Sequence, residues 1–599
     1  MAILDNVSNG GDIKQLNIKQ LTSLAEEIRE RIINGTYSNG GHLASNLGVI
    51  ELTVALHYVF DFSNDKIIFD VGHQCYAHKI LSGRLKDFEL IRKEGGISGF
   101  PSVEESPYDA YTSGHAGTAI GAGLGYCFAR DKLGQNYEVV SVVGDASFLN
   151  GVSSEALMTA DKKPNNFIVI LNDNGMSISK NSSGMYKALA KMTTKSRYEK
   201  FKRALKRIFG NSFITKFLIS IRNFTKKLLG GNTYLDSLGF KYVGVVDGHD
   251  MKELVKTLKL VKSARKPVLL HVNTKKGKGY KEAEDNARQY HGVSKCFEQS
   301  ENAFSGALGD ALCELVNKES KIHAITAAMA DGTGLTSFAE KYPDNFTDVG
   351  ISEEYAVTLS AGMALGGLKP VVCVYSTFLQ RAYDQILQDV CMQNLPVTFC
   401  LDRAGVVGAD GQTHQGVFDL SYLRHMPNMT VFAPKDTAEM KKMLSVAVGM
   451  GSPVAIRYPN GKDYEFIQTN TPIDSWEVMQ GGGDITVLAV GGRMLDIALK
   501  ASKMCDKKIS VVNARVVKPL DVKMLEEIKD KPIITLEDNV LSGGFGSAVS
   551  EYLVNKGYKT DLKIMALNDG VIKQAGVERQ LELNGISVES LVDAIKKYD

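Results

Sequence analysis

Short runs of apolar, often β-branched residues recur along the chain, and helical stretches separate them. The runs cover residues 139–145, 167–173, 267–274, 370–377, 396–403, 453–458, 485–490 and 532–538. Continuous apolar strands that alternate with helices are typical of parallel sheets covered on both faces. The pattern predicts an α/β fold with central, mostly parallel sheets flanked by helices.

Several of these predicted strands end in polar residues. Asp145 closes the first run, Asn174 follows the second, Thr377 closes the fourth and Arg403 closes the fifth. Open α/β sheets bind their ligands at the carboxyl ends of the strands. We therefore expect the chemistry of this chain at these strand ends.

Two polar stretches, residues 294–303 and 468–484, interrupt the alternation of strands and helices. Such stretches typically link separately packed units. They divide the chain into three predicted domains of about 1–302, 303–474 and 475–599. A chain of 599 residues is long enough for three large domains, each with a sizeable core.

The composition is that of an ordinary globular protein. Charged residues make up 23% and hydrophobic residues 44%, which argues against disorder, collagen-like repeats and coiled coils. The 70 Lys and Arg nearly balance the 68 Asp and Glu, and the net charge of +2 is too small to indicate nucleic acid as the main partner.

The eight cysteines are scattered and form no C-x-x-C pair, so neither a zinc site nor a disulfide framework is predicted. The N-terminal sequence lacks a basic stretch followed by an apolar one, and no apolar run is long enough to span a bilayer. We expect a cytoplasmic protein with reduced thiols and no membrane span.

One segment departs from the average composition. Between residues 187 and 227 the chain carries thirteen Lys and Arg residues and a single acidic residue, Glu199. Its apolar residues recur at helical spacing, so we interpret residues 187–230 as a basic helical insertion in the first domain. Contact with a membrane surface, an acidic partner or a lid function are the alternatives.

Asp145 and Asn174 form the first candidate site. They place a carboxylate and an amide oxygen at the ends of two predicted strands, and Mg²⁺ prefers such oxygen ligands together with phosphate oxygens. Alternatively, these residues only form turns after strands. The pair resembles the G-D-G…N signature of thiamine diphosphate (ThDP) enzymes, which implies Mg²⁺ ligation by Asp145, Asn174 and the backbone carbonyl of Met176.

Longer motifs carry a closer resemblance. They are the G-G-H-L-A-S segment from Gly40 with its continuation to His57, D-V-G-H-Q at 70–74, Y-S-T-F-L-Q-R-A-Y-D-Q at 375–385, D-R-A-G-V-V-G-A-D-G-Q-T-H-Q-G at 402–416, L-E-D-N at 536–539 and G-G-F-G at 543–546. They resemble the 1-deoxy-D-xylulose-5-phosphate synthase family of transketolase-like ThDP enzymes. The resemblance implies a diphosphate-binding (PP-type) first domain, an aminopyrimidine-binding (Pyr-type) second domain and a transketolase-like third domain.

The same resemblance implies an activity and its partners. It implies a ThDP- and Mg²⁺-dependent transferase that joins pyruvate to D-glyceraldehyde 3-phosphate with loss of CO₂. It further implies a homodimer that supplies precursors for isoprenoid, thiamine and pyridoxal synthesis.

Residue roles follow from the matched motifs. The resemblance implies catalytic roles for Glu353, His42, His73, His291 and His414. It implies cofactor contacts for His73, Gly114, His115, Ala116, Gly144, Asp145, Ala146, Asn174, Met176, Glu353 and Phe378. It implies acceptor contacts for Tyr375, Arg381, Arg403, Asp410, His414 and Arg457.

Physical chemistry supports several of these roles. The family glutamate matched by Glu353 hydrogen-bonds the aminopyrimidine ring, and a poorly solvated carboxylate suited to that task has a raised pKa. Imidazoles move protons near neutral pH, and guanidinium groups bind phosphate bidentately. The alternatives are Glu354 as the acidic group, a surface or interface role for Arg381 and a core role for Phe378.

The remaining histidines are interpreted as structural. They are His57, His78, His249, His271, His323 and His425.

Three departures from the family pattern leave rival functions open. Ala146 replaces the second glycine of the metal signature, Tyr355 stands where histidine is common, and Ala116 and Gly117 replace two hydroxyl residues. One rival is a divergent paralogue with transketolase-like two-carbon transfer or another acceptor. The other is a non-catalytic ThDP-binding protein.

Overall fold

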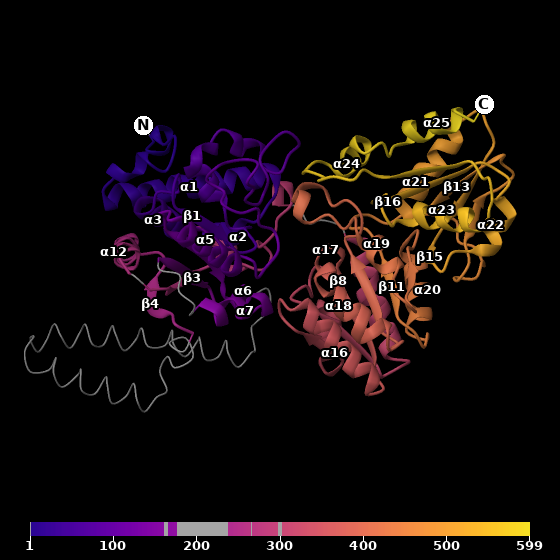
Figure 1. Cartoon of the computed structure of the whole chain (residues 1–599), viewed down its shortest axis with the longest axis horizontal. Helices are drawn as coiled ribbons and strands as arrows, with labels where there is room; N and C mark the ends of the chain where they lie inside the picture. The colour runs from indigo at the N-terminus through magenta and orange to yellow at the C-terminus, as the bar shows by residue number, and fades with distance from the viewer. Residues whose placement is uncertain (1, 161–165, 176–237, 265, 298–301, 599) are drawn as a thin grey trace, which may run out of the picture. The chain divides into compact units, whose positions relative to one another are not determined.

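The computed structural model describes residues 2–160, 166–175, 238–264, 266–297 and 302–598. Contacts divide the chain into two compact units (Figure 1). The first unit comprises Met1–Ile91 and Gly95–Glu298, and the second comprises Arg92–Glu94 and Gln299–Asp599. Met176 and the basic segment 187–230 lie outside the described residues, so their predicted roles stay predictions.

The first unit is built on a parallel five-stranded sheet with the order β1-β2-β3-β5-β4. Its strands are β1 (Lys66–Phe69), β2 (Val139–Gly144), β3 (Phe167–Asp173), β4 (Lys241–Asp247) and β5 (Val268–Asn273). Alternate strand residues face two separate apolar clusters, because successive side chains of a strand point to opposite faces. Both faces of the sheet are therefore covered.

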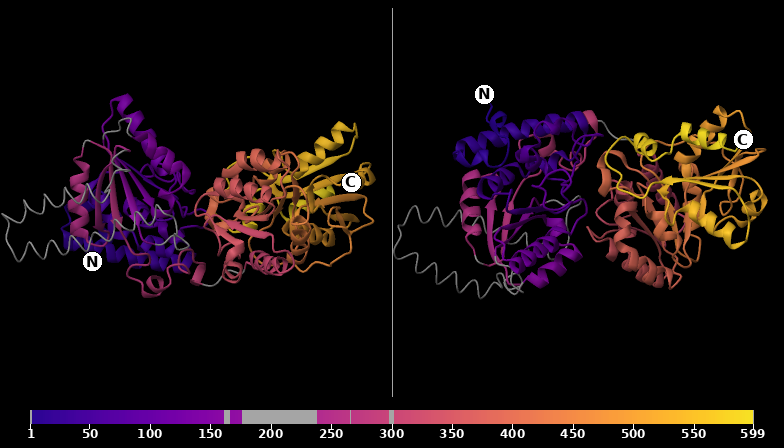
Figure 2. Two further views of the ribbon diagram at one scale, coloured as in Figure 1. Left: turned by 90° about the horizontal axis from the view of Figure 1, so that it is seen from below. Right: turned by 45° about the horizontal axis from the view of Figure 1, so that its top comes forward.

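Helices cover the two faces of this sheet (Figure 2). One cluster includes residues of α1 (Ile18–Asn39), α3 (Ile50–Val59) and α12 (Met251–Lys262). The other includes residues of α5 (Ala119–Leu133) and α7 (Gly151–Thr159). Short helices at the strand ends are α2 (Leu43–Leu47), α4 (Tyr76–Lys79), α6 (Asp145–Phe148) and α13 (Lys281–Asp285).

The second unit contains two sheets, with the orders β15-β10-β11-β9-β8-β6-β7 and β12-β14-β13-β16-β17. The first sheet consists of β6 (Ile322–Thr326), β7 (Phe346–Asp348), β8 (Lys369–Tyr375), β9 (Thr398–Asp402), β10 (Thr430–Phe432), β11 (Val454–Arg457) and β15 (Val516–Lys518). The second consists of β12 (Glu477–Gln480), β13 (Ile485–Ala489), β14 (Ile509–Asn513), β16 (Ile533–Val540) and β17 (Leu562–Leu567). Among the described strands of these two sheets, the edge strands β15 and β12 pair antiparallel with their neighbours, and the other pairs are parallel.

The helices of the second unit pack against these sheets through two apolar clusters. Those around the seven-stranded sheet are α14 (Ala303–Val316), α15 (Thr336–Lys341), α16 (Glu353–Leu365), α17 (Ser376–Leu379), α18 (Tyr383–Gln385), α19 (Asp419–Arg424) and α20 (Thr437–Ala447). Those around the five-stranded sheet are α21 (Gly491–Met504), α22 (Val522–Ile528), α23 (Phe545–Asn555), α24 (Val577–Leu583) and α25 (Val588–Lys596).

The structure confirms the predicted α/β class. Each of the eight apolar runs forms a strand: β2, β3, β5, β8, β9, β11, β13 or β16. The pattern missed β1, β4, β6, β7, β10, β12, β14, β15 and β17, and these include β6 and β14, which are as long and nearly as buried as predicted strands. All eight cysteines lie in the described residues and are free thiols. Every helix in the described parts of the chain is too short or too polar to cross a bilayer.

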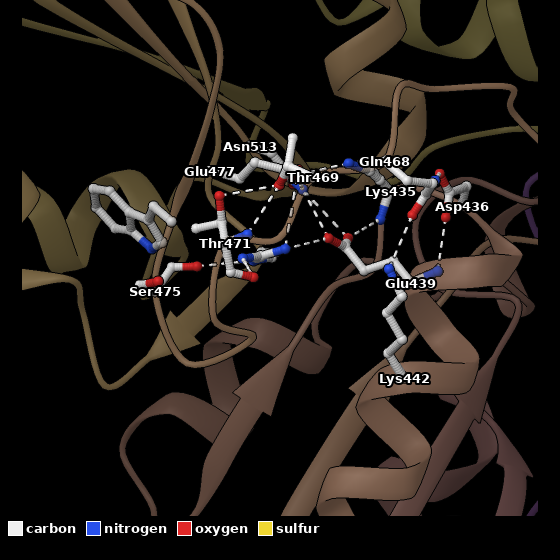
Figure 3. Close-up of polar contacts among 12 residues, drawn as sticks. Lys435, Asp436, Glu439, Lys442, Gln468, Thr469, Thr471, Ser475, Glu477 and Asn513 are labelled. Carbon is white, nitrogen blue, oxygen red and sulfur yellow. Dashed lines mark hydrogen bonds and ion pairs between the residues drawn. The ribbon is translucent and has the colours of Figure 1, made fainter.

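A buried polar cluster joins the two sheets of the second unit (Figure 3). Lys435 Nζ donates to Glu477 Oε2 at 2.7 Å, and Arg515 Nη1 donates to Glu439 Oε1 at 2.8 Å. Asn513 Nδ2 contacts both carboxylates. Because β15 also crosses into the seven-stranded sheet, the two regions share one packed unit, and the predicted boundary at 474/475 stays a prediction.

Candidate active site

Three histidines that are far apart in the sequence come together in the first unit. The ring centroids of His42 and His73 lie 5.3 Å apart, those of His42 and His291 5.6 Å, and those of His73 and His291 5.2 Å. Burial, with smaller contributions from Lys276 and His42, holds the pKa of His291 well below its ordinary value. A neutral imidazole at neutral pH can accept a proton.

Asn46 holds two of these histidines in place. Its Nδ2 donates to the carbonyl oxygens of His42 at 2.6 Å and His73 at 2.7 Å, and its Oδ1 accepts from the Tyr76 N–H at 2.9 Å. Asn46 is completely buried. The sequence did not single out Asn46, because nothing in the local pattern shows which backbone groups its amide meets.

Asp70 links the D-V-G-H-Q segment to the 113–118 loop. Its carboxylate accepts from the backbone N–H of Gly117 at 2.9 Å and of Ala119 at 3.0 Å, at the start of α5. The loop that contains the predicted cofactor residues Gly114, His115 and Ala116 is thereby tied to the loop that contains His73. Helix N-termini with nearby backbone N–H groups suit phosphate groups.

Asp145 and Asn174 follow the neighbouring strands β2 and β3, as predicted. Asp145 is buried, and its Oδ2 accepts no hydrogen bond from any described residue. Burial and then the charge of Asp173 raise the pKa of Asp145 to about 6, although Lys276 partly opposes this. A buried carboxylate oxygen without a donor is one that a cation would satisfy.

The surroundings of Asp145 also fit a divalent ion and a diphosphate. A Cβ built on Gly144, the residue before Asp145, would meet no described atom within 4 Å, so there is open space at this strand end. No group of three or more His, Cys, Asp or Glu side chains gathers to hold a metal in the described residues. Mg²⁺ needs no such cage, because it is usually held by one or two protein groups together with phosphate oxygens and waters.

A buried hydrogen-bond chain supports the turn that contains Asn174. Tyr242 Oη lies 2.9 Å from His271 Nδ1, and His271 Nε2 lies 2.9 Å from Asp173 Oδ2. The other oxygen of Asp173 accepts from the Gly175 N–H at 3.0 Å. His271 therefore acts on the turn through Asp173, which agrees with the structural role expected for it.

Glu353 is the first residue of α16 in the second unit. Its side chain is only 5% exposed, and its Oε2 accepts no hydrogen bond from the described residues, with Arg381 Nε 4.0 Å away. Burial raises the pKa of Glu353 to about 7, and Arg381 offsets this only in part. The neighbouring Glu354 is half-exposed, so the two carboxylates have different environments.

Four of the predicted cofactor and acceptor residues form one aromatic and cationic group. The rings of Tyr375 and Phe378 stack with centroids 5.7 Å apart, and the His414 ring meets Phe378 edge-on at 5.6 Å. The guanidinium of Arg403 lies 3.8 Å from the centroid of the Tyr375 ring. Burial raises the pKa of Tyr375 to about 12, so its hydroxyl stays protonated at neutral pH.

Arg403 directly follows β9 and Arg457 ends the neighbouring strand β11, but the two arginines have different surroundings. Arg403 Nη1 donates to the Gly332 carbonyl at 3.0 Å and to Asp402 at 2.9 Å. Arg457 is only 4% exposed and donates to Asp419 and Asp538. Its charge is already compensated by two carboxylates, and its predicted contact with the acceptor phosphate stays a prediction. Asp410 lies in the 3₁₀-helical segment Gly408–Thr413.

The comparisons with known proteins agree with this organisation. Residues 4–274 match the family model of 1-deoxy-D-xylulose-5-phosphate synthase, residues 300–462 the transketolase pyrimidine-binding domain and residues 474–591 the transketolase C-terminal domain. The chain is 46% identical to 1-deoxy-D-xylulose-5-phosphate synthase of Carboxydothermus hydrogenoformans, over 98% of each chain. It is 44% identical to the same enzyme of Clostridium tetani, over 99% of each chain.

Proposed function

The chain belongs to the 1-deoxy-D-xylulose-5-phosphate synthase family of transketolase-type transferases, and on this premise we propose how its residues carry out the family's reaction. Pyruvate, D-glyceraldehyde 3-phosphate and one proton give 1-deoxy-D-xylulose 5-phosphate and CO₂. The identity of 46% over 98% of both chains carries this assignment. The product serves isoprenoid and thiamine synthesis.

The cofactor proposed for this reaction is thiamine diphosphate. When bound, it supplies a nucleophilic carbon that adds to the pyruvate carbonyl and takes up the electrons left by the loss of CO₂. Glu353 Oε2 is proposed to share a proton with the aminopyrimidine ring, since a carboxyl with a pKa of about 7 can give or take a proton at neutral pH. The match of residues 300–462 to a pyrimidine-binding domain supports this role.

Mg²⁺ is proposed at the strand ends of the first unit. Asp145 and Asn174 would bind it, together with the carbonyl of Met176 and diphosphate oxygens. The buried, unsatisfied Oδ2 of Asp145 supports this proposal.

Proton handling and acceptor binding are assigned to two separate groups. His42, His73 and His291 are proposed to orient substrate and move protons. Arg403 is proposed to bind the acceptor phosphate, because its planar N–H groups match phosphate oxygens.

A homodimer in the cytoplasm is also proposed. Large apolar side chains remain exposed on the second unit, including Tyr355 at 55%, Leu365 at 66% and Met392 at 66%. Exposed apolar surface of this kind favours association with another chain. The eight free thiols support a reducing compartment.

The experiment that tests the function is NMR of products formed from ¹³C-pyruvate. The full-length protein is incubated with ThDP, Mg²⁺ and D-glyceraldehyde 3-phosphate, and each component is omitted in turn. Labelled 1-deoxy-D-xylulose 5-phosphate should form only when both substrates and the cofactor are present. Absence of this product from protein shown by calorimetry to bind ThDP would overturn the proposal.

A further inference from the structure

Asp538 connects three segments of the second unit that lie far apart in the sequence. It belongs to β16 and its side chain is buried. Its Oδ1 accepts from Arg457 Nη1 at 2.8 Å, and its Oδ2 lies 3.4 Å from Arg493 Nη1. Burial alone would raise the pKa of Asp538, but Arg457 and Arg493 together hold it below its ordinary value. Asp538 is therefore ionised at neutral pH and interacts with both arginines.

The turn that follows Arg403 packs directly against this carboxylate. Gly405 has a φ of +77°, and a Cβ built on it would collide with Asp538 Oδ2. The glycine exchanges two backbone hydrogen bonds with Gly416, at 2.7 and 2.9 Å. Arg403 itself adopts a φ of +59°, an uncommon value for a residue with a side chain. The turn that follows Arg403 thus lies directly against the Asp538 carboxylate, and only a glycine fits at position 405.

Arg457 links Asp538 to the end of β8 through a second carboxylate, that of Asp419. Its Nε donates to Asp419 Oδ2 at 3.0 Å, and the same oxygen accepts from Ser376 Oγ at 3.0 Å. Ser376 follows Tyr375, whose ring lies under the Arg403 guanidinium. Asp538 therefore supports Arg403 from two directions: through the 403–405 turn and, by way of Arg457, through the segment that contains Tyr375.

We propose that Asp538 is a positioning residue for the acceptor phosphate and acts through Arg403. The proposal rests on the proposed function, in which Arg403 binds that phosphate. It gives the C-terminal L-E-D-N motif a role in acceptor binding, although Asp538 itself, being an anion, does not bind the phosphate.

The neighbouring Glu537 provides a matched control. It is also completely buried, but its oxygens accept from the backbone N–H groups of Phe545 and Gly546, each at 2.7 Å, at the start of α23. Glu537 therefore supports a different element. Burial raises the pKa of Glu537 to about 8, so Glu537→Gln replaces a mostly neutral acid, whereas Asp538→Asn removes a charge. Both variants change a buried acidic side chain of the same strand, and only Asp538→Asn changes the partner of Arg457 and the neighbour of the Gly405 turn.

The test compares steady-state kinetics of the full-length ThDP- and Mg²⁺-loaded protein with those of Asp538→Asn and Glu537→Gln. For Asp538→Asn, KM for D-glyceraldehyde 3-phosphate should rise about 10- to 100-fold, since a misplacement of about 1 Å is that costly. KM for pyruvate, and kcat/KM for D-glyceraldehyde without its phosphate, should change less than about twofold. Glu537→Gln should leave all three values near wild type.

A double-mutant cycle tests whether the effect passes through Arg403. In an Arg403→Ala background, Asp538→Asn should raise KM for the phosphorylated acceptor no further. A full additional increase would overturn the proposal, and so would equal losses with phosphorylated and unphosphorylated acceptors.

Hydrogen exchange provides a measurement that does not depend on activity. Amides of residues 403–417 should exchange faster in Asp538→Asn than in Glu537→Gln, and unchanged exchange would refute the positioning role. If the wild type makes no 1-deoxy-D-xylulose 5-phosphate, the proposed function is wrong. The hydrogen-exchange comparison still tests whether Asp538 holds residues 403–417 in place. Should Asp538→Asn not fold, Arg493→Gln removes one support of Asp538 and should act in the same direction.

Discussion

Replacing Glu353 by glutamine should stabilise the cofactor-free second unit in a pH-dependent way while strongly lowering turnover. The carboxyl has a pKa of about 7 in the folded protein and 4.5 as its ordinary value. Below pH 4.5 it is protonated in both folded and unfolded states, so it carries no penalty. Between pH 4.5 and 7 only the unfolded state ionises, so stability falls as pH rises.

The magnitude follows from the size of the pKa shift. One pKa unit corresponds to about 1.4 kcal/mol, so Glu353 destabilises the folded state by about 3 kcal/mol above pH 7. The attraction to Arg381 is already contained in that pKa. Glutamine keeps the shape of the neutral acid and does not titrate. The stability of Glu353→Gln relative to wild type should therefore grow by about 3 kcal/mol from pH 4.5 to 7 and stay level above.

The single tryptophan allows the stability difference between Glu353→Gln and wild type to be measured. Trp476 is buried in the second unit, so its fluorescence reports the unfolding of that unit in urea. Midpoints are compared for wild type, Glu353→Gln and the half-exposed control Glu354→Gln between pH 5 and 8. A difference between wild type and Glu353→Gln that does not change with pH would refute the reasoning, as would equal behaviour of the two variants. Turnover of Glu353→Gln should fall about 10²- to 10⁴-fold.

Three further changes should have separable effects. Asp145→Asn should weaken Mg²⁺ binding at least about tenfold in calorimetric titrations with ThDP, because it removes the charge from a buried oxygen ligand; unchanged affinity would remove Asp145 from the metal site. Arg403→Lys should raise KM for D-glyceraldehyde 3-phosphate about tenfold and leave KM for pyruvate unchanged, because a point charge replaces a planar fork; equal changes in both constants would argue against phosphate binding. Asn46→Ala should cost about 2–4 kcal/mol of stability in thermal unfolding and lower kcat, because buried carbonyl groups of His42 and His73 lose their donor; a variant as stable as wild type would show that these bonds contribute little.

The positions of eight central strands along the chain were predictable from the sequence, whereas the order of the strands in each sheet was not predicted. Strands buried on both faces appear as uninterrupted apolar runs, and all eight predicted runs are strands. Strands such as β7 and β15, with three residues each, were not predicted, because a short edge strand has neither the length nor the apolar run that marks a central one.

Some residues of the candidate site were predicted from the sequence, and others were found only in the structure. Motifs and strand ends pointed to Glu353, Asp145, Arg403 and the histidines, because a reacting group must have a particular chemical type at a particular place in the motif. Their assigned roles stay predictions to be tested. The supporting residues Asn46, Asp70 and Asp538 were not given roles, since their function lies in the partners they meet.

The sequence by itself determined the fold class, the family and the chemical types at the strand ends, because periodicity and motifs are local properties of the chain. Only the tertiary structure decided which carboxylates are desolvated: Glu353 is buried and has a raised pKa, whereas the adjacent Glu354 remains half-exposed. It also decided that Asp538 meets Arg457 and the Gly405 turn. Burial and contacts between distant segments arise only when the sheets and helices pack, so no local pattern can encode them.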